Sequence, residues 1–162
     1  MHIVLDGISA LEYWMSTLSD TARYVDVPNP RLTDFSSLSC KDLAARLGRS
    51  EGKPGGIELL VRERSERRSA GGIVCSCWGS RPLPPRAICE VGDGVFVVSP
   101  ELCLVRLATR LPDLELFRVA SDLMSLYSLS VLDRMDIVHR DPLLTRERMV
   151  RFLDDCEGVR GM

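Results

Sequence analysis

The pattern of apolar residues changes at Ser99, and this change constrains the fold more than any other feature of the chain. Between Ile57 and Val98, apolar residues gather in short runs of strand length that Gly and Pro separate. After Ser99, they recur at the three- and four-residue spacing of one helix face. Strands followed by helices predict an α+β fold, in which a small antiparallel sheet in the middle third is flanked by N-terminal helices and a helical C-terminal third.

The predicted organisation is a single compact domain over 1–162. Its parts are a helical N-terminal segment with a Pro-rich loop (1–56), the antiparallel sheet (57–98) and a helical part (99–162). Four apolar runs are expected as strands of that sheet: 57–61, 73–78, 87–91 and 95–98. The last two flank a Gly-Asp-Gly turn, so they are expected to form a hairpin.

Small polar residues mark the expected helix starts. Ser99 is placed to cap a helix whose first residue, Pro100, needs no backbone partner for its nitrogen. Ser9 is likewise placed to cap a helix over 10–18. The following stretch, 19–37, is rich in Pro, Ser and Asp and is expected to be a loop.

Three further helices are expected from apolar spacing. A short one covers 40–47, and another starts at Pro112 with an apolar face that extends to Tyr127. The last covers 145–155 and is expected to bury four apolar side chains: Met149, Val150, Phe152 and Leu153.

Composition narrows the class of protein. The chain has 162 residues, of which 45% are apolar and 27% charged, and its net charge is −2. These values allow a sizeable core and exclude a disordered or fibrous protein. No apolar run reaches the length of a membrane-spanning helix, and residues 1–7 lack the features of a signal peptide. We therefore expect a cytoplasmic protein whose six cysteines are reduced thiols.

The sequence carries no strong catalytic or metal-binding motif. Cys75 and Cys77 share one face of a predicted strand, but no second closely spaced pair accompanies them to complete a structural zinc site. The chain lacks the G-x-S-x-G motif of serine hydrolases and the P-loop of nucleotide-binding proteins. We therefore expect no catalytic residue, metal or cofactor. A nuclease or hydrolase would have to use carboxylates such as Asp133 and Asp136.

Arginine dominates the basic residues and is concentrated in one stretch. Of the 21 basic residues, only Lys41 and Lys53 are lysine. Residues 46–86 hold nine Lys or Arg against four Glu, a local charge of +5 that leaves −7 for the rest of the chain. Six arginines are candidate contacts for phosphate groups or for a partner: Arg62, Arg64, Arg67, Arg68, Arg81 and Arg86. Trp78, beside several prolines, is a candidate aromatic contact. For the basic stretch, the alternatives to phosphate contact are a solvated edge and a patch that binds an acidic protein.

The middle of the chain also resembles known proteins. The resemblance depends on these segments in order: an Arg-rich connection (62–68), Ile-Val-Cys-Ser-Cys-Trp-Gly (73–79), Pro-Leu-Pro-Pro (82–85), Val-Gly-Asp-Gly-Val-Phe-Val-Val-Ser-Pro (91–100) and Leu-Cys-Leu-Val-Arg-Leu-Ala (102–108). This order is similar to a region of actinobacterial proteins related to abortive-infection antitoxins of the AbiEi type. It also resembles the non-catalytic region before the nuclease domain in actinobacterial proteins of the very-short-patch-repair endonuclease type.

The resemblance covers about 57–110 and implies less than the whole function of either group. In place of the winged helix-turn-helix of AbiEi-type regulators, residues 1–56 show two short predicted helices around a Pro-rich loop. The carboxylate-rich core of the endonucleases does not follow in this sequence. The resemblance therefore implies neither operator recognition nor nuclease activity.

Two functions remain as expectations. The first is a non-catalytic binding protein of prokaryotic defence or counter-defence, which contacts DNA or a nucleoprotein complex through the Arg-rich stretch. The alternative is a protein-interaction module, either antitoxin-like or a phage- or mobile-element-borne inhibitor such as an anti-CRISPR-type protein. Such a module would block a partner protein, such as a cognate toxin or a defence enzyme, by docking. Acidic residues would then face a basic partner: Asp113, Glu115, Asp122 and the group 154–157.

Overall fold

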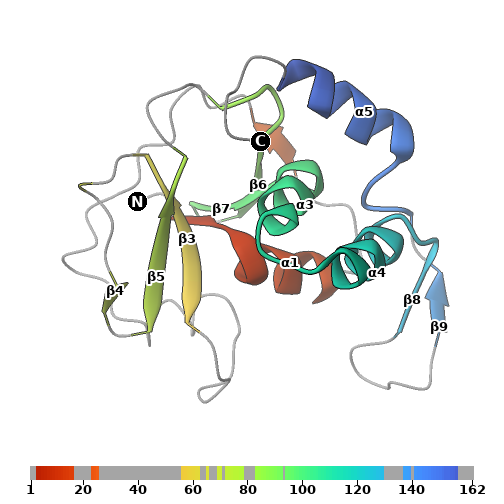
Figure 1. Cartoon of the computed structure of the whole chain (residues 1–162), viewed down its shortest axis with the longest axis horizontal. Helices are drawn as coiled ribbons and strands as arrows, with labels where there is room; N and C mark the ends of the chain where they lie inside the picture. Colours follow the sequence, from red (N-terminus) through yellow and green to blue (C-terminus); the bar gives the residue numbers. More distant parts are fainter. Residues whose placement is uncertain are drawn as a thin grey trace.

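The first strand, β1 (Ile3–Leu5), lies at the centre of the sheet in the computed structural model of the chain (Figure 1). Its three residues are apolar and fully buried, as expected for a strand covered on both faces. The structure describes residues 3–16, 23–25, 56–62, 65, 69–70, 72–78, 83–92, 94–129, 137–139 and 141–156.

Within these described ranges, seven strands form one sheet in the order β2-β6-β7-β1-β3-β5-β4. The strands are β2 (Arg23–Val25), β3 (Ile57–Val61), β4 (Ser69–Ala70), β5 (Ile73–Cys77), β6 (Ile88–Gly92) and β7 (Val95–Val98), together with β1. All four strands expected from the middle third are present, and β6 and β7 form the expected hairpin. The α+β class is therefore confirmed.

The sheet is mixed, however, where the sequence predicted an antiparallel one. β1 pairs parallel with β7, and β3 pairs parallel with β5; the other neighbours are antiparallel. Parallel neighbours cannot be joined by a tight turn, so the chain must cross over between β3 and β5. β1 and β2 also extend the sheet beyond the middle third, and β2 falls within the stretch expected to be a loop.

Two helices cover one face of this sheet. Helix α1 (Gly7–Ser16) follows β1 directly, and α3 (Pro100–Ala108) follows β7; they pack against each other and against β7. Trp14 fixes α1 on the sheet, because its indole N–H donates to the carbonyl oxygen of Val98 at 2.9 Å. The sheet and these two helices enclose the hydrophobic core.

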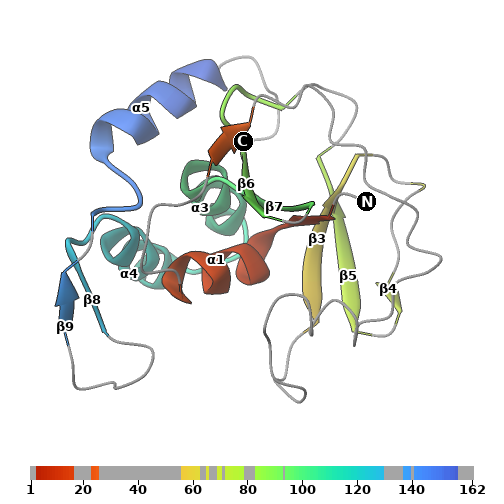
Figure 2. The same cartoon turned by 180° about the vertical axis from the view of Figure 1, so that it is seen from behind.

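The C-terminal elements lie outside this pair of helices. Helices α4 (Asp113–Leu123) and α5 (Arg146–Asp155) both pack on α3. The hairpin β8 (Tyr127–Leu129) and β9 (Ile137–His139) lies beyond α4, at the opposite end of the molecule from β4 (Figures 1 and 2). None of the described helices is long and apolar enough to cross a membrane.

The local signals for the last helices were informative. Ser99 caps α3, since its hydroxyl accepts from the Leu102 N–H, and Pro100 is the first helical residue. Thr145 caps α5 in the same way by accepting from the Arg148 N–H. Helix α4 ends earlier than predicted: it stops at Leu123 and Tyr127 belongs to β8. The helix predicted over 40–47 lies outside the described residues.

Ser9 does not cap α1, which already begins at Gly7. Its hydroxyl instead accepts a hydrogen bond from the Glu58 N–H on β3 at 2.9 Å. A Cβ at position 7 would require the carboxylate of Glu58 and the guanidinium of Arg110 to move aside. Gly7 also has a φ of +52°, which L side chains rarely adopt. This tight junction was not visible in the sequence.

Asp6, between β1 and α1, is the most deeply buried ionisable group of this junction, with 1% of its surface exposed. Its carboxylate accepts from the Arg106 guanidinium on α3, with Nη2 at 2.7 Å from Oδ2, and from the Ser76 hydroxyl on β5. A second ion pair joins Glu58 to Arg110, which is more exposed than Arg106. Both Nη groups of Arg110 donate hydrogen bonds to the Glu58 carboxylate. Asp6 thus joins β1, β5 and α3.

Asp6→Asn is expected to lower the free energy of unfolding by about 2–4 kcal/mol, because the Arg106 charge loses its buried partner. Glu58→Gln is the matched control and should lower it by about 1 kcal/mol or less, since Arg110 is half exposed. Urea unfolding of both variants at neutral pH measures the difference. Equal losses would show that Asp6 does not hold the junction together.

Candidate functional site

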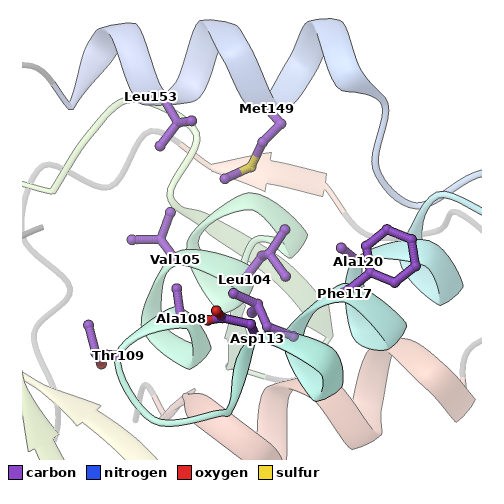
Figure 3. Close-up of a pocket in the computed structure, with 10 residues that line it drawn as sticks. Leu104, Val105, Ala108, Thr109, Asp113, Phe117, Ala120, Met149 and Leu153 are labelled. Atoms are coloured by element: carbon purple, nitrogen blue, oxygen red, sulfur yellow. The ribbon is translucent and has the colours of Figure 1, made fainter.

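An apolar groove lies between α3, α4 and α5 (Figure 3). Its volume is about 640 Å³, within the range of pockets that bind ligands or peptide side chains. Helix α3 and the turn after it supply the floor, α4 one wall and α5 the other. The lining residues are Leu104, Val105, Ala108, Thr109, Asp113, Leu116, Phe117, Ala120, Met149 and Leu153.

Helical spacing explains how the groove forms. Positions 113, 116, 117 and 120 lie on one face of α4, and positions 149 and 153 lie on one face of α5. Figure 3 shows Met149 and Leu153 pointing from α5 toward Val105 and Leu104 on α3. Each wall packs on α3, and the space between the walls is the groove.

The two walls are joined at one end. The N–H of Leu144, just before α5, donates to the carbonyl oxygen of Leu123 at the end of α4, at 3.1 Å. The chain thus enters α5 beside the end of α4. Asp113, in the first turn of α4, and Leu153, in the last turn of α5, lie away from this joined end, with Val105 between them (Figure 3).

Large apolar side chains around this groove remain in contact with solvent. Phe117 is 69% exposed and Leu114 73% on α4, while Val150 is 49% and Leu153 44% exposed on α5. The prediction that Val150 and Leu153 are buried was therefore wrong, whereas Phe152 is buried as predicted. Contiguous exposed apolar surface on a folded domain is typical of interaction sites.

A buried ion pair lies between α3 and α5. Glu101 is 4% exposed, and its Oε1 accepts a hydrogen bond from Nε of Arg148 at 2.9 Å. Nη2 of Arg148 lies 2.8 Å from the same oxygen, within ion-pair distance. The Arg148 guanidinium also lies over the ring of Tyr24 on β2, 5.1 Å from its centre. The other carboxylate oxygen of Glu101 accepts no hydrogen bond from the described part of the chain.

Burial raises the pKa of Glu101 above its ordinary value of 4.5. Three weaker effects lower this pKa: the Glu101 backbone N–H, the Ser99 hydroxyl and the positive charge of Arg86. The folded protein therefore holds this proton more tightly than the unfolded chain does, so ionising Glu101 reduces stability as pH rises. This effect begins near pH 4.5 and extends upward until the folded-state carboxyl is fully ionised.

Glu101→Gln removes this titration and keeps the shape of the side chain. We expect the unfolding free energy of the unmodified protein to fall relative to that of the variant as pH rises from 4 to 7. Urea unfolding of both proteins across this range measures the difference. A rise in the unmodified protein relative to the variant would contradict the prediction, since it would mean that ionised Glu101 favours folding.

The structure describes two of the six predicted arginine contacts. Arg62 directly follows β3 and is exposed. Arg86 is also exposed and precedes β6, with a φ of +61°. Its positive charge lowers the pKa of Glu101. The two lie at different strands, and the structure does not bring them together as a site. The other four lie outside the described residues: Arg64, Arg67, Arg68 and Arg81.

Trp78 lies next to Arg62 at the ends of β3 and β5. Its backbone N–H donates a hydrogen bond to the Val61 carbonyl oxygen at 3.3 Å. Its ring is half-buried and packs against the hydrophobic core. This places Trp78 at the edge of the core, with part of the ring accessible to a partner.

The cysteines and acidic residues do not assemble a reactive centre in the described ranges. Cys75 and Cys77 are half-buried and reduced, and burial raises the pKa of the Cys103 thiol, which keeps it protonated. No three His, Cys, Asp or Glu groups of these ranges come close enough to hold a metal ion. Asp133 and Asp136 lie outside them.

Comparison with protein-family models, with curated proteins and with solved structures gave no match. The sequence did not predict the groove, because the apolar residues of these helices fit buried helix faces equally well. One signal was available: Leu114 and Phe117 fall beside the stripe of α4 that Leu116, Ala120 and Leu123 bury, so the apolar surface is wider than one buried face needs.

Proposed function

We propose that this protein is a non-catalytic interaction module that docks an apolar segment of a partner protein in the groove between α3, α4 and α5. The observation that carries the proposal is the exposure of Phe117 and Leu153 on opposite walls of one apolar groove. Buried aromatic and aliphatic side chains supply most of the energy of protein interfaces, and this groove offers both types, exposed within the part of the chain that the structure describes.

The polar groups nearby fit binding better than catalysis. Asp6, between β1 and α1, and Glu58, on β3, each form an ion pair with an arginine. The groove contributes one carboxylate, Asp113, and one hydroxyl, that of Thr109, which donates to the Arg106 carbonyl oxygen. A groove lined by so few polar groups supports a protein that acts by docking, as an antitoxin-like protein or an inhibitor does.

Selection from a displayed random-peptide library tests the proposal. We expect enriched peptides whose affinity falls about tenfold or more in the double variant Phe117→Ser/Leu153→Ser. Val74→Ser is the matched control, since Val74 is 47% exposed on β5, away from the groove, and its loss should leave the affinity unchanged. Because all three side chains are exposed, the variants should keep most of the stability of the unmodified protein.

Enriched peptides that bind Phe117→Ser/Leu153→Ser as tightly as they bind Val74→Ser would overturn the assignment of the groove as the docking site. A labelled DNA duplex of mixed sequence is the second ligand to titrate, at about 50 and 200 mM salt. Binding that falls steeply with salt and is lost in Arg67→Ala/Arg68→Ala, together with peptides indifferent to the groove variant, would instead favour contact with DNA or a nucleoprotein through the Arg-rich stretch.

A further inference from the structure

The open end of the groove is acidic. Asp113 and Glu115 lie in the first turn of α4, and Asp154 and Asp155 lie in the last turn of α5. All four are exposed, and none forms an ion pair with another residue in the described ranges. Asp113 lines the groove, and the other three belong to the two helix turns that lie away from the joined end.

The walls as a whole are also acidic. Their exposed charged side chains are six carboxylates and three guanidiniums, a net charge of −3: Asp113, Glu115, Asp122, Glu147, Asp154 and Asp155 against Arg118, Arg146 and Arg151. A second copy of the chain would bring a face of the same charge to this one, which opposes self-association through it. A basic partner is attracted.

The lining of the groove favours a helix over an extended peptide. No strand edge lies among its residues, and its polar groups are limited to Asp113 and Thr109. An extended peptide would therefore bury backbone N–H and C=O groups without partners, which is costly. A helix satisfies its own backbone groups and presents apolar side chains at i, i+3, i+4 and i+7 to a groove of this kind.

We infer that the groove takes an amphipathic helix of a partner protein, with apolar side chains against Phe117, Leu104 and Leu153 and Lys or Arg side chains beside Asp113 and the last turn of α5. This inference rests on the proposed function and adds the class of partner: a basic amphipathic helix. The partner's apolar face supplies affinity, and its basic residues supply the preference over acidic helices.

Three fluorescently labelled peptides of about 18 residues test it, a length at which isolated helices form. The first has Leu at i, i+3, i+4 and i+7 and Lys at the polar positions of both terminal turns. The second replaces those Lys with Glu, and the third keeps Lys but scrambles the Leu positions. In fluorescence anisotropy at low salt, we expect the first to bind about tenfold or more tightly than the other two.

Protein variants identify the groups responsible. The triple variant Asp113→Asn/Asp154→Asn/Asp155→Asn should weaken binding of the Lys peptide about tenfold and leave the Glu peptide unaffected or improved. Asp141→Asn is the control, because Asp141 is exposed outside both walls. Phe117→Ser/Leu153→Ser should weaken both amphipathic peptides.

Different failures have different meanings. Equal binding of the Lys and Glu peptides, both lost in Phe117→Ser/Leu153→Ser, would overturn the basic partner and leave the docking groove in place. Equal binding of the scrambled and amphipathic Lys peptides would overturn the helix. Dimers that dissociate in Phe117→Ser/Leu153→Ser, measured by sedimentation, would make a second copy the occupant. The proposed function itself fails only if no selected peptide depends on Phe117 and Leu153.

Discussion

The buried pair between Asp6 and Arg106 is the constraint on which the rest of the structure depends. Asp6 directly follows the central strand, and its carboxylate has almost no contact with water, so a cation must lie beside it in the folded state. Arg106 meets this requirement from α3, and Ser76 adds a donor from β5. The position of α3 on the sheet is thereby set by charge as well as by apolar packing.

A second acid–arginine pair connects the same helix to the next layer. Glu101, five residues before Arg106, pairs with Arg148 of α5. Helix α3 therefore carries an ionic contact to the sheet and another to α5, and apolar side chains such as Leu104 and Val105 lie between these contacts. Since α4 also packs on α3, the groove owes its shape to one helix that positions two others. Exposed apolar side chains on both walls then face the same space.

The site suggested by the sequence and the site suggested by the structure differ for a physical reason. A run of arginines is visible as composition, whereas a groove exists only when helices distant in sequence come together. Leu104 and Leu153 each fit a buried helix face when read alone, and only the placement of α5 leaves Leu153 half exposed. The acidic residues of α4 and α5, noted first as a surface for a basic partner, gain a definite position at the open end of the groove.

The sequence by itself determined the elements: the strands between Ile57 and Val98, the helix starts at Ser99 and Thr145, and the α+β class. These depend on local spacing and capping, which act over a few residues. The tertiary structure alone decided the parallel pairing of β1 with β7, the burial of Asp6 and the groove. Asp6 and Arg106 are 100 positions apart, and such partners are chosen by the packing of the whole chain, which no local pattern encodes.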